Sequence, residues 1–175
     1  MTTQRWPAAW LLTDERLGSD LDAALQRAAA ARAGILVRHY HSPPEERRRI
    51  AARVRELGCV LAMAGDPELA RDCGALLLHN ASGPALGLPT SRSVHDEAEA
   101  EATASGRHAL VFVSPVFATA SHPGAAVLGE DQALWLAQRC GIPAIALGGM
   151  TPARGARLIT RGFSGWAAID YWLRI

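Results

Sequence analysis

The sequence predicts a (β/α)8 barrel of the TIM type, in a compact form with shortened or missing helices. Two observations lead to this prediction: eight short apolar runs recur along the 175 residues, and helical segments separate most of them. Most runs are continuously apolar, as expected of parallel strands that are buried on both faces. Strands that alternate with helices form a parallel sheet, and eight of them suggest that the sheet closes into a barrel.

Each apolar run has the length of one strand, although only some are followed by a full helix. The predicted strands cover residues 10–13, 35–39, 60–65, 75–80, 89–94, 108–113, 143–149 and 165–169.

Three of the intervening segments carry clear helix-end signals. Helices are predicted over residues 19–34, 42–58 and 151–162. Each range begins with a serine or threonine, which can cap a helix N-terminus, and ends with a glycine, which can terminate it. Prolines in the first turn strengthen the second and third predictions.

The chain is short for this fold, because such barrels typically need about 250 residues. The connection over residues 81–88 is too short and too rich in Gly and Pro for a full helix, and the helix over 67–74 has barely two turns. Only Asp170 and residues 171–175 follow the eighth strand. We therefore expect one domain over residues 1–175, which a second copy could complete in a homodimer.

Composition and charge favour a compact intracellular protein. The formal net charge is +1, so there is no electrostatic case for nucleic acid or a membrane surface as partner. No apolar run approaches the roughly 20 residues of a membrane span, and the N-terminus lacks the apolar core of a signal peptide. We expect a cytoplasmic protein, with its three cysteines, Cys59, Cys73 and Cys140, reduced.

All eighteen basic residues are arginines. The lack of lysine excludes Schiff-base chemistry and a P-loop, since both need a lysine amine. An anionic ligand would have to be held by arginine, backbone N–H groups or hydroxyls.

In such barrels the reactive groups gather where the strands end, on one rim. Polar residues stand at several predicted strand ends, among them Arg38, His79, Ser114 and Asp170. Arg38 follows three apolar residues and is costly to bury unpaired. It must meet either an anionic ligand or an acid such as Asp14.

Two loops on this rim point to an anion. Gly148 and Gly149 end the seventh strand just before a helix, where backbone N–H groups can approach a phosphate, although an ordinary turn with positive φ also needs glycine. The sixth strand ends in FVSPVFATASHPG, which sets Thr119, Ser121 and His122 in quick succession. A plain surface turn needs only the final Pro-Gly. The hydroxyls and the imidazole indicate a place that holds something small and polar.

These motifs, in their order, resemble the thiamine phosphate synthase/TenI family. The resemblance runs nearly end to end, and its most specific parts are SVH before an acidic helix, SPVF-x-T, and IPAIALGG-x-TP. It implies a (β/α)8 barrel. It also implies either a synthase that joins a pyrimidine pyrophosphate to a thiazole phosphate with Mg²⁺, releasing pyrophosphate, or a thiazole tautomerase.

The resemblance implies roles for individual residues. Arg38 matches the arginine that contacts pyrophosphate, Thr119 and Ser121 match hydroxyl residues near phosphate, and Gly149 matches the glycine at the thiazole phosphate. His122 stands where the family has a lysine. Gly148, Ser114 and His79 complete the predicted binding site.

The chain also departs from the family at charged positions. The glutamine and lysine that flank the family's arginine are Leu36 and Tyr40 here, and the second Mg²⁺ acid falls on Pro84. Asp66 lies one place after the first Mg²⁺ acid and is the candidate metal ligand. Asp170 replaces a serine that holds phosphate.

The catalytic histidine of the tautomerase branch falls on Pro115. Three functions therefore stay open: a synthase, a regulatory relative that only binds a small phosphorylated heterocycle, and a different enzyme that uses His79, His122 and Asp170 as acid and base.

Overall fold

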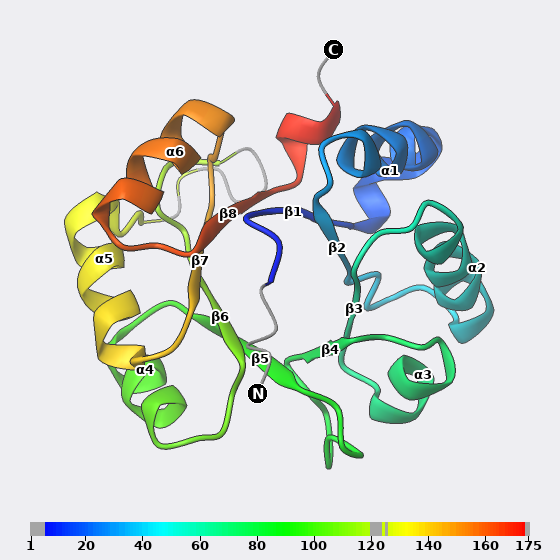
Figure 1. Ribbon diagram of the computed structural model, residues 1–175, viewed down its shortest axis with the longest axis horizontal. Coiled ribbons are helices and arrows are strands. Elements are labelled where there is room, and N and C mark those ends of the chain that lie inside the picture. The colour runs from blue at the N-terminus through cyan, green and yellow to red at the C-terminus, as the bar shows by residue number, and fades with distance from the viewer. Residues whose placement is uncertain (1–5, 120–123, 125, 174–175) are drawn as a thin grey trace.

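The computed structural model describes residues 6–119, 124 and 126–173 and contains eight parallel strands that close into a barrel in chain order (Figure 1). This confirms the predicted (β/α)8 architecture. The strands are β1 (Ala9–Leu12), β2 (Gly34–Val37), β3 (Leu61–Ala64), β4 (Leu77–His79), β5 (Thr90–Val94), β6 (Leu110–Val113), β7 (Ala144–Leu147) and β8 (Gly165–Ala168).

Helices surround the strands, but the ring is incomplete. The α-helices are α1 (Leu21–Ala30), α2 (Pro44–Glu56), α3 (Pro67–Asp72), α4 (Glu97–Ala104), α5 (Gly129–Cys140) and α6 (Pro152–Arg161). A loop without a helix joins β4 to β5, and the prediction of shortened or missing helices is thus confirmed (Figure 1).

Two short 3₁₀ helices complete the described elements. The first, η1 (Glu15–Asp20), precedes α1, and the second, η2 (Asp170–Leu173), follows β8 in place of a closing α-helix. Trp172 of η2 is buried, stacks on Trp166 of β8 with 5.7 Å between ring centroids, and donates from Nε1 to the Trp10 carbonyl at 3.1 Å. The Trp172 indole therefore contacts both β8 and β1, the strands that pair to close the barrel.

The helix-end predictions were right for α6, right only at the C-terminal end of α2, and wrong for α1. The Thr151 hydroxyl caps α6, accepting from the Arg154 N–H at 3.3 Å. The prediction that Ser42 caps α2 was wrong, because Pro43 occupies the cap position and makes no side-chain cap bond.

The prediction of a helix over 19–34 was wrong at both ends. Ser19 lies inside η1, and α1 ends at Ala30. Gly34 begins β2 instead of ending the helix. A Cβ on Gly34 would lie 2.6 Å from the Trp10 ring, so the glycine makes room for a large side chain across the strand pair.

The barrel interior is filled by side chains. Trp10 and Phe112 are fully buried and meet edge to face at 5.9 Å, and the His79 ring meets Phe112 in the same way at 5.2 Å. These aromatic rings pack together and fill the barrel interior.

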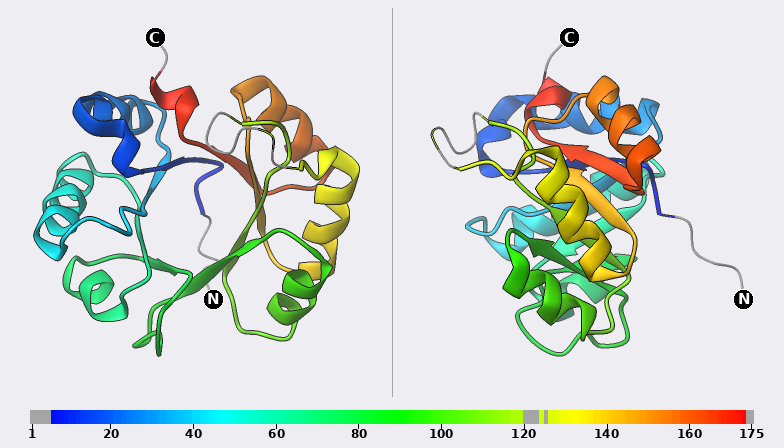
Figure 2. Two further views of the ribbon diagram at one scale, coloured as in Figure 1. Left: turned by 180° about the vertical axis from the view of Figure 1, so that it is seen from behind. Right: turned by 90° about the vertical axis from the view of Figure 1, so that its left-hand side faces the viewer.

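All strands run in the same direction, so their carboxyl ends share one face of the barrel. Figure 2 shows the segment that leads into β1 reaching the barrel from the other side. Among the described residues, no helix has the length and apolar character needed to cross a membrane.

Candidate functional site

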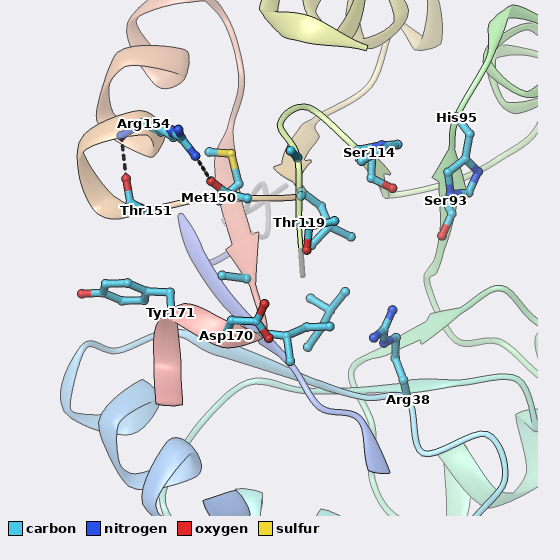
Figure 3. Close-up of a pocket in the computed structure, with 18 of the residues that line it drawn as sticks. Arg38, Ser93, His95, Ser114, Thr119, Met150, Thr151, Arg154, Asp170 and Tyr171 are labelled. Carbon is cyan, nitrogen blue, oxygen red and sulfur yellow. Dashed lines mark hydrogen bonds between the residues drawn. The ribbon is translucent and has the colours of Figure 1, made fainter. Parts of the chain in front are cut away.

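A cavity of about 490 Å³ opens at the carboxyl ends of the strands. Its size falls within the range of small-molecule sites. Figure 3 shows Arg38 on one side of it and Arg154 with Thr151 on another. The lining residues that carry polar side chains are Arg38, His79, Ser93, His95, Ser114, Thr119, Thr151, Arg154, Asp170 and Tyr171.

Arg38 stands at the mouth, just after β2, and is paired with an acid. Its Nη2 lies 3.1 Å from Asp14 Oδ2, and its Nε donates to the Thr13 carbonyl at 3.3 Å. Burial lowers the pKa of Arg38, which the nearby Asp14 charge partly offsets. The sequence left two partners open for Arg38, an anionic ligand or an acid such as Asp14. The structure shows the ion pair with Asp14, and the Arg38 side chain also lines the cavity.

Asp14 serves two arginines. Burial opposes its ionisation, but hydrogen bonds from Arg16 and the charges of Arg16 and Arg38 outweigh burial and lower its pKa. Arg16 Nε lies 2.7 Å from Asp14 Oδ1. Asp14 is therefore an anion near neutral pH, and it neutralises part of the positive charge at this edge of the cavity.

His79 forms the floor of the cavity within a network of hydroxyls. Its Nδ1 lies 3.0 Å from Ser91 Oγ, and its Nε2 lies 3.2 Å from Ser93 Oγ. Asn80 donates from Nδ2 to the same Ser93 oxygen at 3.1 Å. Burial, followed by the charges of Arg38, Arg92 and His95, lowers the pKa of His79 to about 3. The ring is neutral at physiological pH and acts as a fixed hydrogen-bonding group.

Gly148 and Gly149 lie on the cavity wall in the left-handed region, with φ of +100° and +60°. A Cβ on Gly149 would lie 2.4 Å from the Ala118 carbonyl oxygen, and one on Gly148 would lie 2.8 Å from Pro115 Cα. Both glycines thus let the β6 loop pack against the end of β7. That packing alone explains why both positions are glycine, and both residues also line the cavity.

The β6 loop contributes Ser114 and Thr119 to the lining. Ser114 is nearly buried, and its N–H donates to the Val94 carbonyl at 3.0 Å. Ser121 and His122 lie outside the described residues. Their predicted roles stay predictions.

Asp66 does not line the cavity. Its Oδ1 accepts from the N–H groups of Glu68 at 2.9 Å and Leu69 at 3.1 Å, so the carboxylate caps α3. Within the described ranges, no group of three or more His, Cys, Asp and Glu side chains is placed to hold a metal ion. The described residues therefore do not fit a Mg²⁺ site built by the protein, and the metal role of Asp66 stays a prediction.

The sequence analysis did not single out Arg154, and the structure brings it into the cavity. Its guanidinium lies over the Phe117 ring, 4.2 Å from the centroid, and Nη1 donates to the Gly149 carbonyl. The sequence spacing could have identified it, because an arginine three residues after the Thr151 cap lies in the first turn of α6, close to the end of β7. Asp170 and Tyr171, which follow β8, also line the cavity (Figure 3).

Comparison with known proteins supports the barrel fold and indicates which family the chain resembles. A family model described as thiamine monophosphate synthase matches residues 87–171. A thiamine-phosphate synthase of Acidithiobacillus ferrooxidans is 29% identical over 184 residues, covering 92% of this chain and 84% of that protein. The chain is therefore similar to the thiamine phosphate synthase/TenI family over most of its length, and the family model matches its C-terminal half.

Solved structures from this family share the fold. The thiamine phosphate pyrophosphorylase of Pyrococcus furiosus superposes with a TM-score of 0.78 at 18% identity, covering 97% of this chain and 88% of that one. The Bacteroides thetaiotaomicron protein of the same name gives a TM-score of 0.65 at 18% identity, with 94% and 83% covered. Similarity at this level establishes the barrel, while the function must be argued from the site.

Proposed function

We propose that this chain binds a small phosphorylated heterocycle in the mouth of its barrel and joins a pyrimidine pyrophosphate to a thiazole phosphate, releasing pyrophosphate. The observation that carries the proposal is the cavity itself, in a chain similar to this family. It has Arg38 at one side, Gly148 and Gly149 at another, and an apolar wall between them. A ligand with two rings and anionic groups at both ends suits that arrangement.

The reaction requires one bond to form and one to break. A ring nitrogen of the thiazole forms a bond to the methylene carbon of the pyrimidine, and the carbon–oxygen bond to pyrophosphate breaks, with the electron pair leaving on pyrophosphate. Charge thus develops on the leaving oxygen, where a positioned cation stabilises it. Arg38 is the residue placed for this role, and its pairing with Asp14 reduces the net charge that it can offer.

Mg²⁺ is expected to accompany pyrophosphate in this family, but the described residues do not supply a ligand set for it. No step is therefore assigned to the metal. The chain's own contribution is to bind both anionic ends, align the rings and exclude water from the reacting carbon.

A second candidate is a relative that binds the ligand without turnover. Two observations favour it: the Asp66 carboxylate already caps α3, and Asp14 already forms an ion pair with Arg38. The third function, acid–base catalysis by rim histidines, is disfavoured for His79, because a pKa of about 3 is far from that of an efficient general base at neutral pH.

The deciding experiment combines binding with product analysis. The purified protein is titrated with thiazole phosphate and with pyrimidine pyrophosphate, each with and without Mg²⁺, and the mixture is assayed for thiamine phosphate. Thiamine phosphate formation supports the synthase proposal. Binding without product supports the second candidate, and the lack of both refutes the proposed function.

A further inference from the structure

We propose that Arg154 is the main anion-binding side chain of the cavity and that it holds the phosphate of the thiazole phosphate. This proposal rests on the proposed function, which it extends by locating the phosphate at the start of α6. Three features of the structure support the proposal: the contacts that orient Arg154, the charges around it, and the hydrogen-bond donors that lie beside it in the cavity.

Arg154 is held in a fixed orientation by two contacts. Its guanidinium lies over the Phe117 ring at 4.2 Å, a cation–π distance, and Nη1 donates to the Gly149 carbonyl. A guanidinium has five N–H donors, so most remain available after these contacts. A planar, pre-oriented guanidinium suits the two-point recognition of a phosphate.

The two cavity arginines differ in their counter-ions. Arg38 is paired at 3.1 Å with Asp14, a carboxylate that it shares with Arg16. Arg154 forms no ion pair with any carboxylate in the part of the chain that the structure describes, although it lines the cavity. An incoming anion therefore gains more from Arg154 than from Arg38, where it competes with Asp14.

Backbone donors face the same corner. Within the described residues, the N–H groups of Gly149 and Met150 make no backbone hydrogen bond, and both residues line the cavity. Thr151 adjoins them with its hydroxyl at the cap of α6. These donors supplement Arg154 and fit a phosphate better than a carboxylate-sized anion, because a phosphate offers three terminal oxygens.

The position of Asp170 also favours an anion site near Arg154, because its negative charge disfavours one at the end of β8. It lines the cavity at the end of β8, and Figure 3 shows its carboxylate on the cavity side, away from the Arg154 guanidinium. A carboxylate there repels a phosphate, so the β8 end is a poor anion site. The anion should therefore bind nearer to α6, where Arg154 supplies the positive charge.

The test compares Arg154→Gln with Arg157→Gln, each of which removes one positive charge from α6. Arg157 is exposed and paired with Glu130, and it does not line the cavity, so it controls for net charge and helix stability. Arg154→Lys, which keeps the charge but loses the planar fork, is the second variant. Binding is measured by calorimetry with thiazole phosphate, with the corresponding thiazole alcohol and with inorganic phosphate.

We expect Arg154→Gln to weaken thiazole phosphate binding by about 10- to 100-fold, the range of a charge-assisted hydrogen bond, with the alcohol unaffected. Arg154→Lys should lie between Gln and the parent, and Arg157→Gln should change binding by less than about twofold. Thermal unfolding of each variant checks that the fold is retained.

The outcomes separate this proposal from the proposed function. If the parent protein binds thiazole phosphate and Arg154→Gln binds it equally well, Arg154 is not the anion site and the proposed function stands. If phosphate binds in an Arg154-dependent way but thiazole phosphate does not, the anion site stands and the proposed function fails. If neither probe binds the parent protein, both proposals are refuted.

Discussion

The burial of His79 as a neutral ring predicts a loss of stability on mild acidification. Its side chain is only 2% exposed, and its pKa is lowered from 6.5 to about 3. Between these two values the unfolded chain binds a proton at this position and the folded chain does not. Unfolding therefore becomes more favourable as the pH falls from 6.5 towards 3, whereas above 6.5 the contribution is constant.

The magnitude follows from the width of that window. Each pH unit between the two pKa values changes the free energy of unfolding by about 1.4 kcal/mol. From pH 6.5 to pH 5 the loss is about 2 kcal/mol, on the order of 4–8 °C in melting temperature for a chain of this size.

The variant His79→Gln isolates this contribution. Glutamine keeps a donor and an acceptor for Ser91 and Ser93 but does not titrate. Denaturant unfolding of both proteins is measured from pH 7.5 to 5. The buried His39 and the half-buried His108, whose pKa values burial also lowers, are present in both proteins and cancel in the difference.

We expect the stability advantage of the parent protein over His79→Gln to be constant above pH 7 and to shrink by about 2 kcal/mol at pH 5. A difference that does not vary with pH would contradict the reasoning. An NMR titration that finds the His79 ring protonating near pH 6 would contradict it as well.

Three further substitutions test the cavity. Arg38→Ala should weaken binding of pyrimidine pyrophosphate by about tenfold or more in a calorimetric titration while the circular dichroism stays unchanged, and an unchanged affinity would remove Arg38 from the site. Asp170→Ser should raise the affinity for thiazole phosphate, since it removes a repelling carboxylate from the cavity, and a variant with no gain would dismiss that explanation. Gly149→Ala should cost about 1–3 kcal/mol from its backbone conformation alone, with more from the contact at Ala118, and a melting temperature equal to that of the parent would refute the packing of the β6 loop.

The eight strands could be predicted because their signal is local. Buried parallel strands read as continuous apolar runs, and each run from the first to the eighth became a strand with bounds shifted by a few residues. The lack of a helix between β4 and β5 was equally visible, because a short loop rich in Gly and Pro cannot form one. The direction of the strands then placed Arg38, His79, Ser114, Thr119 and the two glycines on one cavity.

Other features depended on partners far away in the chain. Gly34 resembles a helix terminator until the Trp10 ring is seen against it, across a strand pair. The cap that the Asp66 carboxylate forms on α3 was likewise not foreseen, because it depends on the local backbone geometry at the start of that helix.

By itself, the sequence determined the barrel, its missing helices and the face that carries the cavity, since hydrophobic pattern and strand direction specify these. Only the tertiary structure decided which charges in the cavity are neutralised. Asp14 meets Arg38 across the ends of β1 and β2, while Arg154 meets Phe117 across those of β6 and β7. Such pairings arise between segments that folding brings together, and spacing along the chain does not encode them.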